Sequence, residues 1–324
     1  MVESNRLDWI DVAKGLGISS VVIGHVYTNY IHWIIFAFHM PLFFFLSGIT
    51  LKPKQLKIKK IFKGLIIPYV SYLFLLSIIV IILNGIQLDI WYYISFIKSK
   101  MYGGVRLVKE FGVFWFPTVL FISLAYIKLI YVINNKNNIS IEILNILFIL
   151  CTSYILYEYI NIYKLPFGFE IISISLPLII FGYLYNNYLN LNTSIWIVFL
   201  FITSFYLLIF LYINGYKELD MKTLYIGENG INYFSSFIFI LLIIYFSKII
   251  DYLEIKFIKN MLIELGKSSI TIMFLHQFFH FTFKENILDN KLFLVLISIL
   301  IPYIIHLLFK RNQYTSLIFG AKNV

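Results

Sequence analysis

Long apolar runs recur along almost the whole chain, and the polar residues gather in the short stretches between them. Each run is long enough, at about 20 residues, for an α-helix to cross about 30 Å of hydrocarbon. Backbone inside lipid must satisfy its own hydrogen bonds, and these runs are too evenly apolar to be the alternating strands of an outer-membrane barrel. The pattern therefore predicts an all-α, polytopic membrane helix bundle.

We predict about ten transmembrane helices in a single domain over residues 1–324, with no appended extracellular domain. Three runs are interrupted, by Glu158, Pro177 and His276. The amino terminus is polar and no small-residue cleavage site follows the first run, so we expect no cleavable signal peptide. The predicted spans are residues 11–30, 31–51, 64–84, 113–133, 141–160, 170–186, 194–213, 231–248, 268–284 and 291–309.

Composition supports a membrane protein, and the charges indicate its orientation. Of the residues, 60% are hydrophobic and 13% are charged, whereas soluble domains carry roughly 25% charged residues. With the amino terminus in the cytoplasm, 17 of the 26 lysines and arginines fall on the inner side. The densest block, KPKQLKIKKIFK at 52–63, lies in a short connection, where the positive-inside rule has most force. The net charge of +10 is therefore interpreted as a topology signal, and no nucleic acid partner is expected.

The first span carries three side chains that a membrane helix normally avoids, Asp11, Lys14 and His25. At about 100° per residue, all three lie on one helical face, and about 16 Å of helix separates Lys14 from His25. An ionisable group deep in the bilayer is costly unless it is paired or lines a watery cavity. This polar stripe is the first candidate functional site, although Asp11 and Lys14 alone could be interfacial residues.

The second span returns through the membrane and carries His39 in the run FAFHMPLFFFLSG. His25 and His39 stand at similar distances from the predicted turn near residue 30, so we expect them at similar depth, lining one cavity. Pro41 lacks a backbone donor and should kink this helix. The small residues Ser47 and Gly48 permit a close helix contact.

Several motifs follow one another along the chain. They are RLDWIDVAKGLGISSVVIGH at 6–25, FAFHMPLFFFLSG at 36–48, the basic block, FWFPTVLF at 114–121, FGYLY at 181–185 and LGKSSITIMFLHQ at 265–277. In this order they resemble acyltransferase family 3. Within that family the chain most resembles the bacterial sugar O-acetylases of the fucose 4-O-acetylase type. The resemblance implies a multi-pass protein of the bacterial inner or plasma membrane. It also implies transfer of an acyl group, usually acetyl from cytoplasmic acetyl-CoA, to a hydroxyl of a cell-surface or lipid-linked glycan, beside glycan-assembly proteins.

The resemblance also assigns roles by position. His25 matches the essential histidine of the family and His39 belongs to the element that follows it. Lysines stand where the family often has arginines that would hold the CoA phosphates, although lysine cannot grip phosphate bidentately. The basic block has a second interpretation, contact with anionic membrane lipid. The expected cofactor-binding residues are Lys14, Lys60, Lys63 and Arg6, and the expected supporting residues are Asp11, Ser47, Trp115 and His276.

The mechanism expected from these residues is general-base catalysis by His25, which would take the proton of the attacking sugar hydroxyl. Asp11 lies too far along the helix to orient His25, so we expect it to pair with Lys14 or Arg6. The orienting partner of His25 stays open, with His39 first and His276 second. An acyl-histidine intermediate is a second possibility. No metal site is expected, because the pair His276 and His280 lacks a third ligand.

Two other classes of function compete with acyl transfer. A transporter or flippase also places histidines inside a membrane, although no paired broken helices occur in two corresponding halves of this chain. A purely structural partner of a polysaccharide synthase would not need His25. The outer loop LYIGENGINYF offers Tyr225, Glu228 and Asn229 as candidate contacts for the acceptor.

Overall fold

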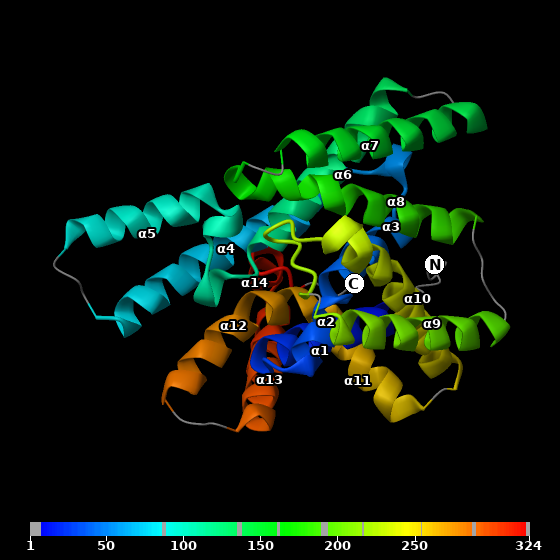
Figure 1. The fold of residues 1–324 in the computed structure, drawn as a ribbon. Coiled ribbons are helices and arrows are strands. Elements are labelled where there is room, and N and C mark those ends of the chain that lie inside the picture. The colour runs from blue at the N-terminus through cyan, green and yellow to red at the C-terminus, as the bar shows by residue number, and fades with distance from the viewer. Residues whose placement is uncertain are drawn as a thin grey trace.

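A computed structural model describes residues 8–85, 89–134, 138–160, 163–188, 194–215, 217–253, 255–286 and 290–321. Helices account for the regular structure in these ranges, apart from one isolated bridge between Asp220 and Tyr225. Figure 1 shows how the helices cross one another. The first helices are α1 (Asp8–Val26), α2 (Tyr30–Phe36), α3 (His39–Ile49), α4 (Ile58–Leu83), α5 (Ile90–Tyr102), α6 (Trp115–Ile133) and α7 (Ile139–Ile160). They are followed by α8 (Ile172–Tyr188), α9 (Ser194–Ile213), α10 (Ile231–Tyr252), α11 (Lys256–Lys267), α12 (Ser269–Asn286), α13 (Lys291–Lys310) and α14 (Gln313–Ile318).

The structure confirms the all-α polytopic bundle and places helix at all ten predicted spans. In the described part of the chain, eight helical segments are long and apolar enough to cross a membrane. The other two predicted spans coincide with α9 and α12. On α12 the polar residues His276, Gln277 and His280 are buried, so this helix owes its place to the interior of the bundle more than to its hydropathy.

The second predicted span is broken, as Pro41 predicts. It consists of α2 and α3, which meet at Ala37 and Phe38. Pro41 has no N–H to donate to the carbonyl of Ala37, and its ring would clash with that carbonyl in a continuous helix. The break falls four residues before the proline and places His39 in the first turn of α3.

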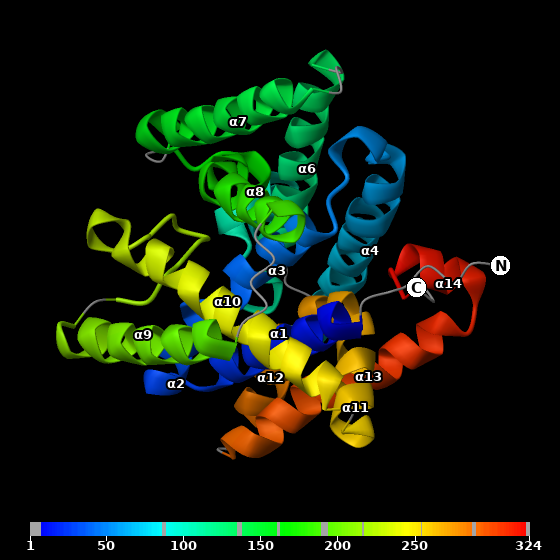
Figure 2. The same cartoon turned by 90° about the vertical axis from the view of Figure 1, so that its right-hand side faces the viewer.

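The helices divide into an enclosed centre and a lipid-facing periphery. Of the most apolar stretch of each helix, 61% is buried in α1 and 67% in the segment that holds α8, but only 22% in α7 and in α13. Figure 2 shows α1 in the middle of the molecule, with α9, α11 and α13 around it. Large apolar side chains on the outer helices, such as Phe74 and Ile82, are exposed and suit contact with lipid tails.

The close helix contact expected at Ser47 and Gly48 is present between α3 and α8. A Cβ atom at Gly48 would overlap the carbonyl oxygen of Ile179, and one at Gly182 would overlap that of Phe45. Two glycines facing each other's backbone let the helices approach without intervening side chains. This contact fixes α3, which supplies residues to both cavities described below.

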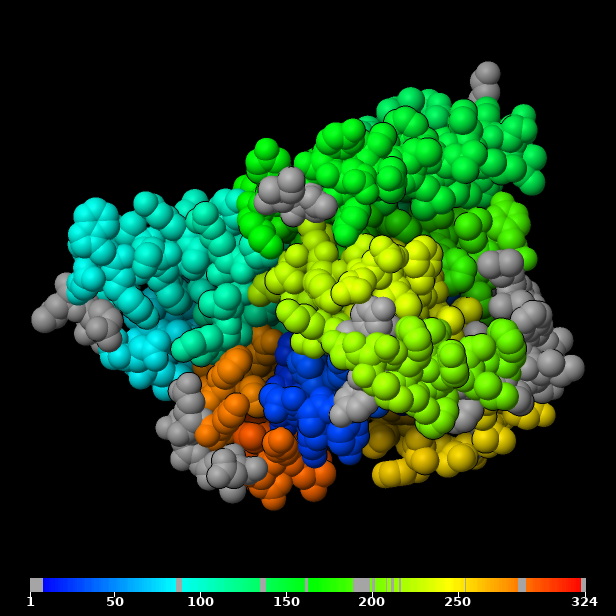
Figure 3. Space-filling model, viewed as in Figure 1, coloured from blue at the N-terminus to red at the C-terminus, as the bar shows by residue number. Residues whose placement is uncertain are grey.

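Three α-helices lie outside the predicted spans: the short α14, and the longer α5 and α11. Helix α5 projects from the body beside the far end of α4, as the cyan hairpin in Figure 1 and the cyan lobe in Figure 3 show. It has no buried residue. Helix α11 is amphipathic, and its Gly266 packs against the backbone of Asp11 in α1. Both were too short or too polar to be recognised as spans.

Candidate active site

A cavity of about 290 Å³ opens where α1 ends and α3 begins, and we call it the histidine cavity. The lining combines two imidazoles from the first helices with an indole from α6 and a lysine from the loop between α9 and α10. The residues that the argument uses are His25, His39, Trp115, Lys109, Lys222 and Gln277. The structure thus brings Trp115 and both predicted histidines into one space.

Three histidines cluster at this cavity. The ring centroid of His25 lies 6.3 Å from that of His39 and 5.3 Å from that of His276. His39 and His276 are almost fully buried, whereas His25 is only partly so. Phe36 closes the group, with its ring centroid 5.6 Å from His25 and 4.5 Å from His39. The expectation that His25 and His39 line one cavity is therefore confirmed.

Backbone hydrogen bonds fix the tautomers of two of these rings. His39 Nδ1–H donates to the carbonyl of Ile35 at 3.0 Å, and His276 Nδ1–H donates to the carbonyls of Ile272 and Met273 at 3.0 and 2.9 Å. A neutral ring that donates from Nδ1 keeps an acceptor lone pair on Nε2. Nε2 of His276 is buried without a hydrogen-bond partner in the described part of the chain. The cluster is thus rich in proton acceptors.

The polar neighbour of His25 is Gln277, not His39 or His276. The amide Nε2 of Gln277 lies 3.4 and 3.3 Å from the two ring nitrogens of His25. These are long hydrogen bonds, suited to a partner that steers the ring without holding it rigidly. Sequence reasoning missed Gln277, although it follows His276 in the motif LGKSSITIMFLHQ.

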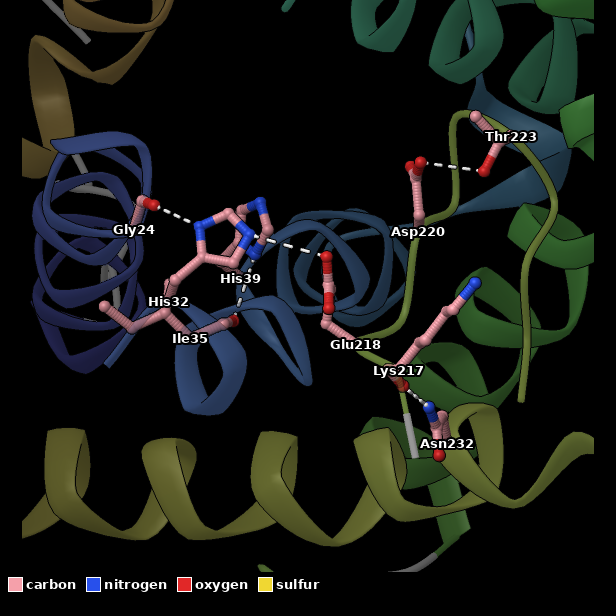
Figure 4. Close-up of polar contacts among 9 residues, drawn as sticks. All are labelled: Gly24, His32, Ile35, His39, Lys217, Glu218, Asp220, Thr223 and Asn232. Carbon is pink, nitrogen blue, oxygen red and sulfur yellow. Dashed lines mark hydrogen bonds and ion pairs between the residues drawn. The ribbon is translucent and has the colours of Figure 1, made fainter. Parts of the chain in front are cut away.

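Residues 219–222 of the loop between α9 and α10 line the histidine cavity, and Figure 4 shows this loop near His32 and His39. His32 on α2 connects this loop to α1. Its Nδ1–H donates to the Gly24 carbonyl at 2.6 Å, and its Nε2 lies 3.8 Å from Glu218 Oε1. Tyr225 and Glu228, the candidate acceptor contacts, line a separate outer cavity of about 260 Å³ and not the histidine cavity.

A second cavity, of about 260 Å³, lies nearer the start of α1, and we call it the lysine cavity. Lys14 and Lys267 line it, together with Asp11 and Ser47. Lys14 Nζ is 3.5 Å from Asp11 Oδ1, which is the pairing expected for Asp11. Lys267 Nζ is 2.8 Å from Glu264 Oε1. Its two lysines are therefore partly balanced by carboxylates.

The two cavities are neighbours, because four helices, α1, α3, α6 and α12, line both. On α12, Met273 lines the lysine cavity and Gln277 the histidine cavity, about 6 Å apart along the axis. On α6, Phe116 lines the lysine cavity and Trp115 the histidine cavity. On α1, Ile18 lines the lysine cavity and His25 the histidine cavity, about 10 Å apart along the axis.

The structure does not bring every predicted residue to a cavity. Lys60 and Lys63 are exposed on the first turns of α4 and line neither cavity, although their neighbour Gly64 lines the lysine cavity. Ser47 donates to the carbonyl of Phe43 at 2.8 Å. Arg6 lies outside the described residues. No three His, Cys, Asp or Glu side chains within the described ranges are arranged to hold a metal ion.

Comparison with known proteins decides the family. A family model for an acyltransferase domain, that of acyltransferase family 3, matches residues 7–315. The chain belongs to this family. Neither a curated protein nor a solved structure matched it.

The family match covers nearly the whole helical bundle, so both cavities of this acyltransferase lie within the matched region. The two cavities lie side by side between the same helices of the bundle.

Proposed function

We propose that this acyltransferase transfers an acetyl group from cytoplasmic acetyl-CoA to a hydroxyl of a cell-surface or lipid-linked glycan, with His25 as the general base. The motif resemblance to bacterial sugar O-acetylases supports the acetyl group and the sugar acceptor. The observation that carries the proposal is the position of His25, partly exposed to a cavity and backed by two buried imidazoles.

The reaction requires a proton to leave the acceptor hydroxyl as its oxygen attacks. A sugar hydroxyl ionises far above neutral pH, and a neutral imidazole within hydrogen-bond reach accelerates its attack by about 10²- to 10⁴-fold. The hydroxyl oxygen forms a bond to the thioester carbonyl carbon while His25 takes the proton. The carbon–sulfur bond then breaks, and the CoA thiolate leaves with the proton that His25 returns. The products are the acetyl ester and free CoA.

Neutral tautomers favour this role for the cluster. His39 and His276 both donate from Nδ1 to backbone carbonyls, so each ring is oriented before substrate binds. A second positive ring beside His25 would oppose its protonation, whereas oriented neutral rings do not. We infer that His39 and His276 pack against His25 and exclude water, and that Gln277 steers its ring.

The lysine cavity is the place that we propose for the donor. With the amino terminus in the cytoplasm, the start of α1 and the basic block both lie at the cytoplasmic face, where acetyl-CoA is available. Lys14 and Lys267 at the cavity would attract the CoA phosphates, with Lys60 and Lys63 as outer charges, and Arg6, outside the described residues, is proposed for the same role. The acyl end would point along α1 toward His25.

The experiment uses membranes that contain the full chain and acetyl-CoA labelled in its acetyl group. Label should enter the surface glycan in an alkali-sensitive bond, and NMR of the glycan with and without the gene should identify the acetylated hydroxyl. His25→Ala should insert normally, bind acetyl-CoA and lose at least about 100-fold of the transfer rate. A matched control is His306→Gln. His306 on α13 is a buried histidine that is hydrogen-bonded to Thr271 on α12, and neither residue lines the histidine cavity.

The outcomes separate the alternatives. Normal transfer by His25→Ala would exclude His25 as the base. Absence of acetyl-CoA binding and of any acetyl group on the glycan would exclude acetyl transfer and favour a transporter or a structural partner.

A further inference from the structure

The loop over the histidine cavity has a defined conformation. The backbone of Asp220 and that of Tyr225 exchange two hydrogen bonds of 3.0 and 2.9 Å. The Asp220 carboxylate accepts from the Lys222 backbone N–H at 3.0 Å and from Thr223 Oγ1 at 2.7 Å. Leu219 and Met221 are buried beneath this turn. The turn therefore holds Lys222 in a fixed direction (Figure 4 shows Asp220 and Thr223).

Lys222 points into the histidine cavity without an acidic partner. Its ammonium donates to the carbonyl of Leu107 and to that of Gly112, the latter at 3.2 Å. No carboxylate of the described residues lies within ion-pair distance of it. Burial lowers the pKa of Lys222 to about 8, although the Asp220 charge opposes this shift. A partly buried ammonium held by two carbonyls has one donor left, and the Asp220 charge balances it only in part.

Lys109 adds a second positive charge to the same lining. It is exposed and its backbone adopts φ of 52°, a left-handed conformation that costs a residue with a side chain about 1 kcal/mol or more. The only carboxylate among the lining residues is Asp220, whose two oxygens already accept hydrogen bonds within its own turn. The cavity that holds His25 is therefore electropositive on its loop side.

We propose that the acceptor of this acyltransferase carries an anionic group, a carboxylate or a phosphate, which binds between Lys222 and Lys109 while the reacting hydroxyl faces His25. This inference rests on the proposed function and names the class of its acceptor: an acidic or phosphorylated sugar rather than a neutral one. Lys222 sets specificity, and its charge takes no part in the proton transfer.

Binding tests the proposal without requiring turnover. The purified full chain is titrated with methyl β-D-glucuronide, methyl β-D-glucoside 6-phosphate and methyl β-D-glucoside, and with their galacto counterparts, by saturation-transfer NMR. The uronides or the phosphates should bind about 10- to 100-fold more tightly than the neutral glycosides, as expected for a charge-assisted hydrogen bond. The uronide and phosphate arms distinguish the two anions. Equal binding of charged and neutral probes, or no binding of charged ones, would overturn the proposal.

Variants then assign the selectivity to one side chain. Lys222→Met should remove most of the preference for charged probes, while Lys222→Arg should retain it. Lys217→Met is the matched control, because Lys217 lies on the same loop but lines the outer cavity. A Lys222→Met protein that keeps the preference, or that weakens charged and neutral probes equally, contradicts the role of Lys222.

The pH dependence of probe binding is an independent test of the role of Lys222. Between pH 7 and 9 the Lys222 ammonium loses its proton, so affinity for the charged probes should fall as pH rises through about 8. The other titratable groups that face this space are Lys109, Asp220, His25 and His39. Lys222→Arg stays protonated and should abolish the fall, and a fall that persists in this variant would contradict the assignment.

The binding measurements also separate this proposal from the proposed function. Selective binding of charged probes by a protein that transfers no acetyl group would support the anion site and contradict the proposed acetyl transfer. Acetyl transfer to a glycan, with equal binding of charged and neutral probes, would keep the function and remove the anion site.

Discussion

The two cavities of this acyltransferase differ in how their charges are balanced. In the lysine cavity, Lys14 and Lys267 each have a carboxylate within 3.5 Å. In the histidine cavity, His39 and the neighbouring His276 donate to backbone carbonyls, and the partners of Lys222 among the described residues are two backbone carbonyls. Balanced charges can be held at little cost until a ligand displaces their partners, whereas unbalanced groups are costly at rest. The difference supports the proposed division, with the acyl donor at the lysine cavity and the acceptor beside His25 at the histidine cavity.

The largest effect should come from removing His25 and leaving the lysine cavity intact. His25→Ala should lower kcat by about 10²- to 10⁴-fold, because no other imidazole is equally open to the cavity. The dissociation constant for acetyl-CoA, measured by equilibrium binding of the labelled donor, should stay within about twofold. Loss of acetyl-CoA binding in this variant would contradict the assignment of donor binding and proton transfer to separate cavities.

The next effect tests the helix that serves both cavities. Gly182→Ala places a methyl group against the carbonyl of Phe45 and should push α3 away from α8. Overpacking of this kind costs about 1 to 3 kcal/mol, so thermal stability, acetyl-CoA binding and the transfer rate should fall together. Gly64→Ala is the control, because a Cβ there meets no atom within 4 Å, and it should leave stability unchanged or slightly raised. Loss of acetyl-CoA binding alone, or of transfer alone, would show that α3 does not couple the two cavities.

A smaller effect should separate the lysines that line the donor cavity from those that do not. Lys14→Met and Lys267→Met should each raise the KM for acetyl-CoA about tenfold, through loss of a charge-assisted contact with phosphate. Lys60→Met and Lys63→Met, on the exposed face of α4, should change it about twofold or less. Steady-state kinetics at varied acetyl-CoA measures both. An inverse ranking would move the phosphate site to the basic block.

The smallest effect should come from the residue that steers His25. Gln277→Leu removes the amide 3.3 to 3.4 Å from the imidazole and should lower kcat about fivefold, the equivalent of one weak hydrogen bond. The KM for acetyl-CoA should not change, because Gln277 does not line the lysine cavity. A loss as large as that of His25→Ala would make Gln277 a direct participant in the reaction.

The sequence by itself determined the features that depend on local periodicity. Twenty-residue apolar runs predict helices regardless of how these pack, so all ten predicted spans contain helix. The short connection between α1 and α2 forces His25 and His39 to one depth. Asp11 and Lys14 are three residues apart on one helix and meet for the same reason. Pro41 broke its helix four residues earlier, as its ring requires.

Only the tertiary structure decided which distant residues share a cavity. Gln277 is 252 residues from His25, and Lys222 reaches the carbonyls of Leu107 and Gly112 over more than 100 residues. No helical period relates these positions, because the crossing angles and the turn at Asp220 set their approach. The same packing leaves Lys60 and Lys63 outside the cavity that their place in the motif suggested. Periodicity fixes which face of a helix is polar, and packing fixes what that face meets.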